Sequence, residues 1–195
     1  IVAVFGFPET NADHAARAVR VAFQLSRTLS AGSNNGDVPG PLGVNVGVSS
    51  GVILTAPRLE RREIFLMSES VELARRFCVA NRFYGSRVLI GPRSFELASS
   101  EIVARPIDFL SGVNAQERHE IFEPLGLVAD ASPELLARRD SFWNGVVLYR
   151  EKRWEEAYVE FTRARIPDEQ EDAPLALYLR RLEPLALQLM EMPGE

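Results

Sequence analysis

The sequence predicts an α/β domain of the α+β kind, followed by an all-α helical appendage. Up to about residue 127, short apolar runs rich in β-branched residues alternate with segments of helical periodicity. Clusters of Gly, Pro, Ser and Asn separate these segments, as loops do. Beyond residue 127 the periodicity is helical only. We therefore expect one domain over residues 1–127 and a helical extension over residues 128–195.

The first domain opens with an apolar run at residues 1–5, which predicts a buried strand. Such a strand is an abrupt start, and it suggests that further sequence precedes residue 1. Small apolar residues then recur at helical spacing, which predicts an amphipathic helix over 13–29. Residues 30–41 have the composition of a loop. Residues 43–54 predict two strands that meet at a turn at 49–51, and residues 56–63 a charged connection.

The second half of this domain continues the alternation of strands and helices. A helix is expected over 68–84, with Gly85 in the position of a C-cap glycine. The other elements expected here are strands at 63–67, 87–90, 102–109 and 119–125, and a short helix at 92–98.

The appendage has clear helix start and stop signals. Ser132 is placed as an N-cap and Pro133 at the first helical position. Pro167 ends the second helix of the appendage. We expect helices over 133–150, 154–165 and 173–190.

The segment WNGVVLYREKRWEEAYVEFTRA resembles a single tetratricopeptide-like helix pair, in which small alanines allow close approach and aromatic residues fill the gap. One such pair cannot bury its own apolar face. It is therefore expected to pack on the first domain or on a second copy of the chain. The alternative is a groove that binds a protein partner.

Composition excludes several classes of function. The net charge of -5 gives no reason to expect nucleic acid as a partner. No apolar run is long enough to predict a membrane span. The single cysteine, Cys78, excludes an internal disulfide. The two histidines, His14 and His119, are far apart and no cysteine cluster accompanies them, so no zinc site is expected.

Five segments of the first domain carry recognisable motifs in a fixed order. They are VAVFGFPETNADHAARAVRVAFQL, VGVSSGVIL, SESVELARRF, NRFYGSRVLIG and RPIDFLSGVNAQERHEIFEPLG. The first resembles M-A-x-F-G-x-P with D-H-A-x-R-A-V, and the third resembles G-D-x-V-N-L-A-A-R-L. These are segments of class III adenylate/guanylate cyclase catalytic domains. The resemblance implies a ferredoxin-like nucleotide cyclase sheet, truncated at its N-terminal end.

The resemblance also implies a chemistry. Class III cyclases join the ribose 3′-hydroxyl of ATP or GTP to the α-phosphorus, with release of pyrophosphate, at a site between two cyclase domains. Two Mg or Mn ions held by two aspartates assist this step. The resemblance places both aspartates before Ile1. We therefore expect no metal site and no cofactor in this chain.

Three positions of the cyclase site fall within this chain, and two of them are substituted. Phe65 stands at the purine-reading position, where its ring cannot hydrogen-bond a base. Glu72 stands at the transition-state Asn position, where a carboxylate opposes a triphosphate. Arg76 matches the transition-state Arg. Because Arg76 lies four residues after Glu72, the alternative to phosphate binding is an ion pair along the helix.

These departures argue against ATP or GTP binding by this chain. The resemblance implies a degenerate purine nucleotidyl cyclase homology domain, non-catalytic by itself, that acts as a regulatory and dimerisation module in cyclic-nucleotide signalling. The expected partner is a second copy or another cyclase domain. The alternative is an active adenylate cyclase that forms cAMP once upstream sequence and a partner complete it. The expected location is the cytoplasm, or the cytosolic part of a larger, membrane-attached protein.

Overall fold

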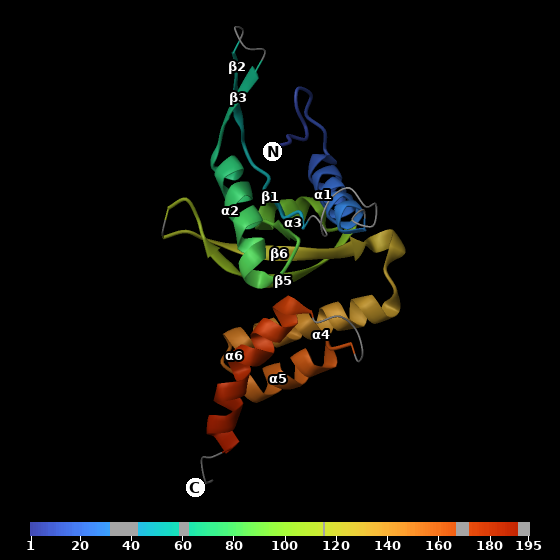
Figure 1. Cartoon of the computed structure of the whole chain (residues 1–195), viewed down its shortest axis with the longest axis vertical. Helices are drawn as coiled ribbons and strands as arrows, with labels where there is room; N and C mark the ends of the chain where they lie inside the picture. The colour runs from blue at the N-terminus through green and yellow to red at the C-terminus, as the bar shows by residue number, and fades with distance from the viewer. Residues whose placement is uncertain (32–42, 59–62, 115, 167–171, 191–195) are drawn as a thin grey trace.

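A computed structural model of the chain describes residues 1–31, 43–58, 63–114, 116–166 and 172–190. An α/β body carries a projecting hairpin at one end, and a group of helices packs against its other side (Figure 1). The strands are β1 (Val46–Val48), β2 (Leu54–Arg58), β3 (Glu63–Met67), β4 (Val88–Ile90), β5 (Ile102–Ser111) and β6 (Arg118–Leu127). The helices are α1 (His14–Ala31), α2 (Glu69–Tyr84), α3 (Pro92–Ala98), α4 (Pro133–Arg150), α5 (Trp154–Arg163) and α6 (Ala173–Met190), with a 3₁₀ turn, η2, at Val128–Asp130.

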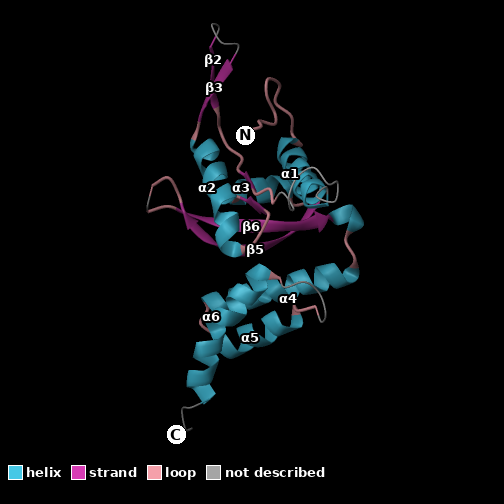
Figure 2. Ribbon diagram, in the orientation of Figure 1, coloured by secondary structure: helices cyan, strands magenta, loops and turns pink. Residues whose placement is uncertain are grey.

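Four of the strands form one sheet in the order β1-β4-β6-β5. β1 and β4 run parallel, as strands joined by a crossover helix do, and the other neighbours are antiparallel. β2 and β3 form a separate antiparallel hairpin, in which Ala56 lies opposite Phe65. This hairpin extends away from the body (Figure 2).

The residues of β4 alternate between two apolar clusters, as the pleat of a strand requires. Val88 and Ile90 belong to the cluster formed with α1 and α3, whereas Leu89 belongs to the cluster that includes α2 and the C-terminal helices. The helices therefore cover the sheet on both sides, and both clusters contain strand residues from β5 and β6.

The C-terminal helices share a core with the sheet. Phe142, Phe161 and Tyr178 pack ring against ring, and all three are buried. The Tyr178 hydroxyl donates a hydrogen bond of 2.6 Å to the carbonyl oxygen of Ile107. β5 is the edge strand of the sheet, and Ile107 lies at a register shift where it has no partner in β6. The appendage thus satisfies a buried carbonyl of an otherwise open edge.

A buried ion cluster adds a second link between the sheet and the appendage. Arg105 of β5 lies 2.7 Å from Glu123 of β6 and 2.6 Å from Asp172, just before α6. Its guanidinium also lies 4.4 Å from the centre of the Phe142 ring. Burial alone would lower the pKa of Arg105, but the two carboxylates outweigh it and raise that pKa. Burial raises the pKa of Glu123, and the charge of Arg105 opposes this rise.

The α/β prediction with an all-α appendage is confirmed, and so are most elements. The strand expected at residues 1–5 is wrong: these residues form no strand, and Ile1 is fully exposed. A strand needs a partner for its backbone groups, and no described strand pairs with this segment.

A second correction concerns residues 43–58. The first strand expected in 43–54 exists as β1, but the second is displaced, because β2 begins only at Leu54. The two also belong to different sheets, since β1 pairs with β4 and β2 with β3. The charged connection expected at 56–63 is wrong at both ends, since β2 reaches Arg58 and β3 begins at Glu63. Residues 59–62, and most of the loop expected at 30–41, lie outside the described residues. No helix in the described part of the chain is long and apolar enough to cross a membrane.

Candidate functional site

The N-terminal turn of α2 is fixed by its cap. Ser68 is extended and its hydroxyl accepts a hydrogen bond from the Ser70 amide, 3.0 Å away. The same hydroxyl donates to the carbonyl oxygen of Val52, at 2.7 Å. The cap therefore ties the start of α2 to the segment that leads into β2.

α2 lies directly on β1. A Cβ added at Gly47 would lie 2.0 Å from the carbonyl oxygen of Ala74, so only glycine permits this approach. The buried Asn81 amide donates to the carbonyl oxygens of Val46 and Phe77, both at 3.0 Å. These contacts hold the helix that carries Glu72 and Arg76 in one position on the sheet.

Glu72 and Arg76 share one face of α2, as their spacing predicts. The Arg76 Nε lies 3.7 Å from a Glu72 carboxylate oxygen. Arg76 Nη1 also donates to the carbonyl oxygen of Gly112 at 2.5 Å and to that of Ser111 at 3.3 Å. Sequence reasoning predicted the ion pair but missed the contacts with the β5–β6 turn. Through these two hydrogen bonds, Arg76 links α2 to the β5–β6 turn.

Phe65 is on another element. It lies on β3 of the projecting hairpin, with its backbone opposite Ala56. Its side chain is outside the part of the structure that is described. The expected purine-reading position thus lies on the β2–β3 hairpin, whereas the Glu72–Arg76 pair lies on a helix that packs on the main sheet.

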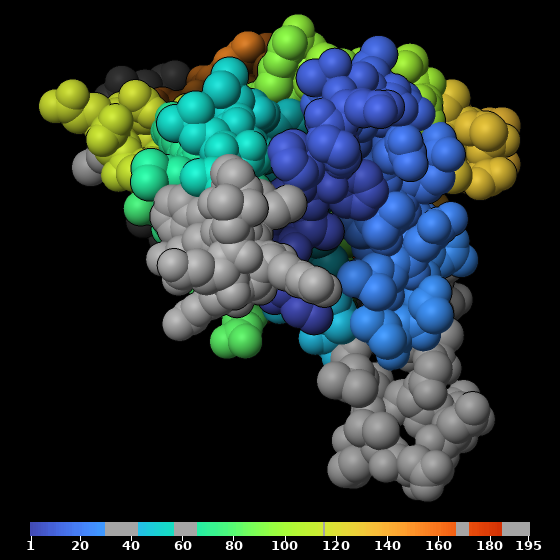
Figure 3. All heavy atoms as spheres, turned by 90° about the horizontal axis from the view of Figure 1, so that it is seen from above, coloured from blue at the N-terminus to red at the C-terminus, as the bar shows by residue number. Residues whose placement is uncertain are grey.

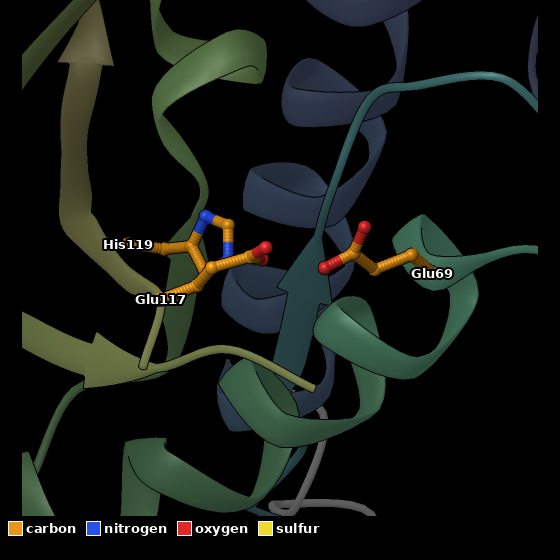
Figure 4. A group of neighbouring side chains, drawn as sticks. All are labelled: Glu69, Glu117 and His119. Carbon is orange, nitrogen blue, oxygen red and sulfur yellow. The ribbon is translucent and has the colours of Figure 1, made fainter. Parts of the chain in front are cut away.

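Sequence reasoning also missed a group of three possible metal ligands. One ligand atom each of Glu69, Glu117 and His119 lies within 4.8 Å of the other two. Glu69 is in the first turn of α2, Glu117 precedes β6 and His119 is within β6, and their side chains point toward one another (Figure 4). The only sequence signal was the single spacing of Glu117 and His119 at positions i and i+2.

A pocket lies elsewhere, beside the N-terminal segment. It has a volume of about 560 Å³, and it is lined by residues 4–11 together with His14 and Arg17. Figure 3 shows this face, where the N-terminal segment and α1 are blue. None of Phe65, Glu72 and Arg76 lines it.

Comparison with known proteins rests on structure alone. No protein-family profile matches the chain, and no curated protein matches it by sequence. The chain superposes on the adenylyl cyclase CyaB from P. aeruginosa with a TM-score of 0.54 and 18% identity, over 66% of this chain and 68% of that one. The fold is that of a class III nucleotidyl cyclase domain.

Two further cyclase domains are also similar. One is the dimeric guanylyl cyclase domain of the RhoGC fusion protein from Blastocladiella emersonii, with a TM-score of 0.47 and 17% identity. The other is the guanylate cyclase domain of RhGC from Catenaria anguillulae, solved with GTP, with a TM-score of 0.45 and 17% identity. Each match covers 63% of this chain and 65% of the other chain, less than two thirds of its length.

The cyclase fold raises the question of a two-metal site, and the described residues do not fit one. Such a site needs carboxylates that hold two ions about 4 Å apart. The carboxylate nearest to Arg76 is that of Glu72, and it is already paired with the guanidinium groups of Arg75 and Arg76, each at 3.7 Å. The only group of three possible ligands in the described chain is Glu69, Glu117 and His119, which has room for one ion.

Proposed function

We propose that this chain is a degenerate purine nucleotidyl cyclase homology domain in cyclic-nucleotide signalling. It is non-catalytic as this chain and acts as a regulatory and dimerisation module. The observation that carries the proposal is the environment of Arg76. This side chain faces Glu72 and donates to the carbonyl oxygens of the β5–β6 turn.

Electrostatics supports the same reading. A phosphate bound at Arg76 would approach the Glu72 carboxylate, and like charges repel. The phosphate would also compete for Arg76 with two carbonyl oxygens of the β5–β6 turn. Because these acceptors belong to the same chain, their contacts with Arg76 cost no entropy of association, whereas binding of a phosphate does. Arg76 thus holds the β5–β6 turn on α2, and Glu72 pairs with Arg76, so both have a structural role.

Exposed apolar side chains support a role in association. Val79 and Phe83 lie four residues apart on the outer side of α2, and about two thirds of each is exposed. Leu54 and Met67 are cross-strand neighbours at the base of the projecting hairpin, and both are exposed. Such surfaces are suited to a second cyclase domain.

The alternative function is an active adenylate cyclase that converts ATP to cAMP and pyrophosphate when upstream sequence and a partner complete it. The similarity in fold to the adenylyl cyclase CyaB favours this alternative. It requires the two metal-binding carboxylates to come from outside the described residues.

Incubation of the purified chain with ATP or GTP and Mn²⁺, followed by mass spectrometry, tests the proposal. We expect no cyclic nucleotide above a heat-inactivated control. The double variant Glu72→Asn with Phe65→Thr should also give none, because it restores purine and ribose contacts but adds no metal ligands. Product from either protein would contradict the proposal and favour the adenylate cyclase.

Nucleotide binding and self-association are measured separately. Fluorescent ATP and GTP analogues should not bind the chain, and Arg76→Ala should leave that result unchanged. Sedimentation should detect a dimer, and Phe83→Asp should weaken it. Tyr158→Asp, which changes an exposed residue of α5, is the control and should leave the dimer unchanged. A strictly monomeric chain at all concentrations would remove the dimerisation role.

A further inference from the structure

An imidazole and two carboxylates from separate elements converge beside the β5–β6 turn (Figure 4). We propose that Glu69, Glu117 and His119 bind one divalent first-row transition-metal ion, with Zn²⁺ as the representative. This inference goes beyond the proposed function, because it needs neither nucleotide nor cyclase chemistry.

The spacing of the three groups is close to that of a metal site. Zn–N and Zn–O bonds of about 2.0–2.2 Å place tetrahedral ligand atoms about 3.3 Å apart. The Glu117 oxygen lies 3.9 Å from His119 Nε2, and all three ligand atoms lie within 4.8 Å of one another. Closure therefore requires the ligand atoms to approach one another by up to about 1.5 Å. Glu69 and Glu117 are exposed and can rotate without disturbing the core.

A second observation concerns His119. Its Nε2 atom is inaccessible to solvent and has no hydrogen-bond partner among the described residues. Buried polar atoms are normally paired, so a nitrogen in this condition suggests a missing ligand. The ring lies against Gly112, where an added Cβ would be 2.7 Å from Nε2. Glycine at this position thus permits the close approach of the His119 ring and of Glu117 to the turn.

The set of donors selects the kind of ion. Mg²⁺ and Ca²⁺ prefer oxygen ligands alone, whereas an imidazole with carboxylates suits Zn²⁺ and its first-row neighbours. Three protein ligands leave a fourth position open for water or for a group of another molecule. Two carboxylates also balance the charge of a divalent ion.

A bound ion would have a structural consequence. Glu69 begins α2, and Glu117 and His119 stand at the start of β6. Arg76 already joins α2 to the same turn, about two helical turns further along the helix. The ion would provide a second link and fix the β5–β6 turn against the start of α2.

Isothermal titration of Zn²⁺ into the full chain, after removal of metal with EDTA, tests the site. We expect one ion per chain, and a weakening of at least about tenfold in His119→Gln and in Glu69→Gln. The matched control is His14→Gln, which removes the other histidine and should bind as the unmodified chain does. Cys78→Ser controls for binding to the thiol. Substitution by Co²⁺ should give the visible absorption of a mixed nitrogen and oxygen site, absent in His119→Gln.

Several results would overturn the proposal. One is the absence of Zn²⁺ binding at millimolar concentration. Another is equal affinity in the unmodified chain and in Glu69→Gln, whose exposed side chain can be changed without loss of the fold. A third is Mg²⁺ binding as tight as Zn²⁺ binding, since that would exclude the imidazole as a ligand. Circular dichroism of each variant establishes that it is folded.

Discussion

Replacing Tyr178 with Phe tests whether the appendage is bound to the edge of the sheet. The change removes only the hydroxyl, which donates a 2.6 Å hydrogen bond to the Ile107 carbonyl oxygen. Tyr178 is 2% exposed and Ile107 is fully buried, so water cannot replace the lost donor. A buried acceptor without a partner costs about 1–2 kcal/mol of unfolding free energy. For a chain of this size the melting temperature should fall by about 2–8 °C.

Urea unfolding, followed by tryptophan fluorescence and by far-UV circular dichroism, measures this change. Tyr158→Phe is the matched control, because Tyr158 is exposed on α5 and its loss should change stability by less than about 0.5 kcal/mol. An effect of Tyr178→Phe no larger than that of the control would mean that the hydroxyl is solvated and that this hydrogen bond does not help to hold the appendage on β5 in solution.

Two further predictions concern the same region. Arg105→Met should destabilise the chain by about 3 kcal/mol, because Glu123 would lose its buried partner. This value is the lower end for a broken buried ion pair, since the other partner, Asp172, is partly exposed. A urea midpoint equal to that of the unmodified chain would contradict this prediction. Gly145→Ala should destabilise by about 1–3 kcal/mol, because its Cβ would lie 2.8 Å from the Phe161 ring. A gain in thermal stability, as expected for alanine at an open helical position, would show that the two helices are further apart.

Elements with local start and stop signals were predictable from the sequence. The helices over 92–98 and 133–150 have the expected bounds, since each has proline in its first turn and the second has Ser132 as a capping residue. The helix over 68–84 ends at Gly85, whose φ of 69° is the left-handed conformation expected of a C-cap glycine. Local chemistry decides these ends, so no knowledge of the fold is needed.

Elements that depend on a distant partner were not predictable in the same way. Residues 1–5 have the composition of a strand, but pairing decides whether a strand forms. The sheet to which β1 and β2 belong depends on α2, which brings β1 beside β4. Tertiary context therefore overrode local preference at both places.

In the candidate site, too, local contacts were predictable and long-range contacts were not. The Glu72–Arg76 ion pair follows from the geometry of a single helix. The contacts of Arg76 with the β5–β6 turn, and the approach of Glu69 to His119, depend on the packing of α2 beside a hairpin far along the chain. The hydrophobic periodicity of the sequence does not indicate which distant elements pack together. The roles of Phe65, Glu72 and Arg76 in a nucleotide site stay predictions.

The change in periodicity near residue 127 predicts a domain boundary, but burial predicts a single cooperative unit. One apolar cluster contains Leu89, Ile107 and Ile121 of the sheet together with Phe142 and Leu182 of the appendage. Separation of the two parts would expose this shared core and leave the Ile107 carbonyl unpaired, so neither part is expected to unfold alone. The Tyr178→Phe variant decides between these views. If the appendage is part of one unit, fluorescence and circular dichroism will report a single transition that shifts as a whole. If it is a separate domain, the hydroxyl will affect only one of two transitions.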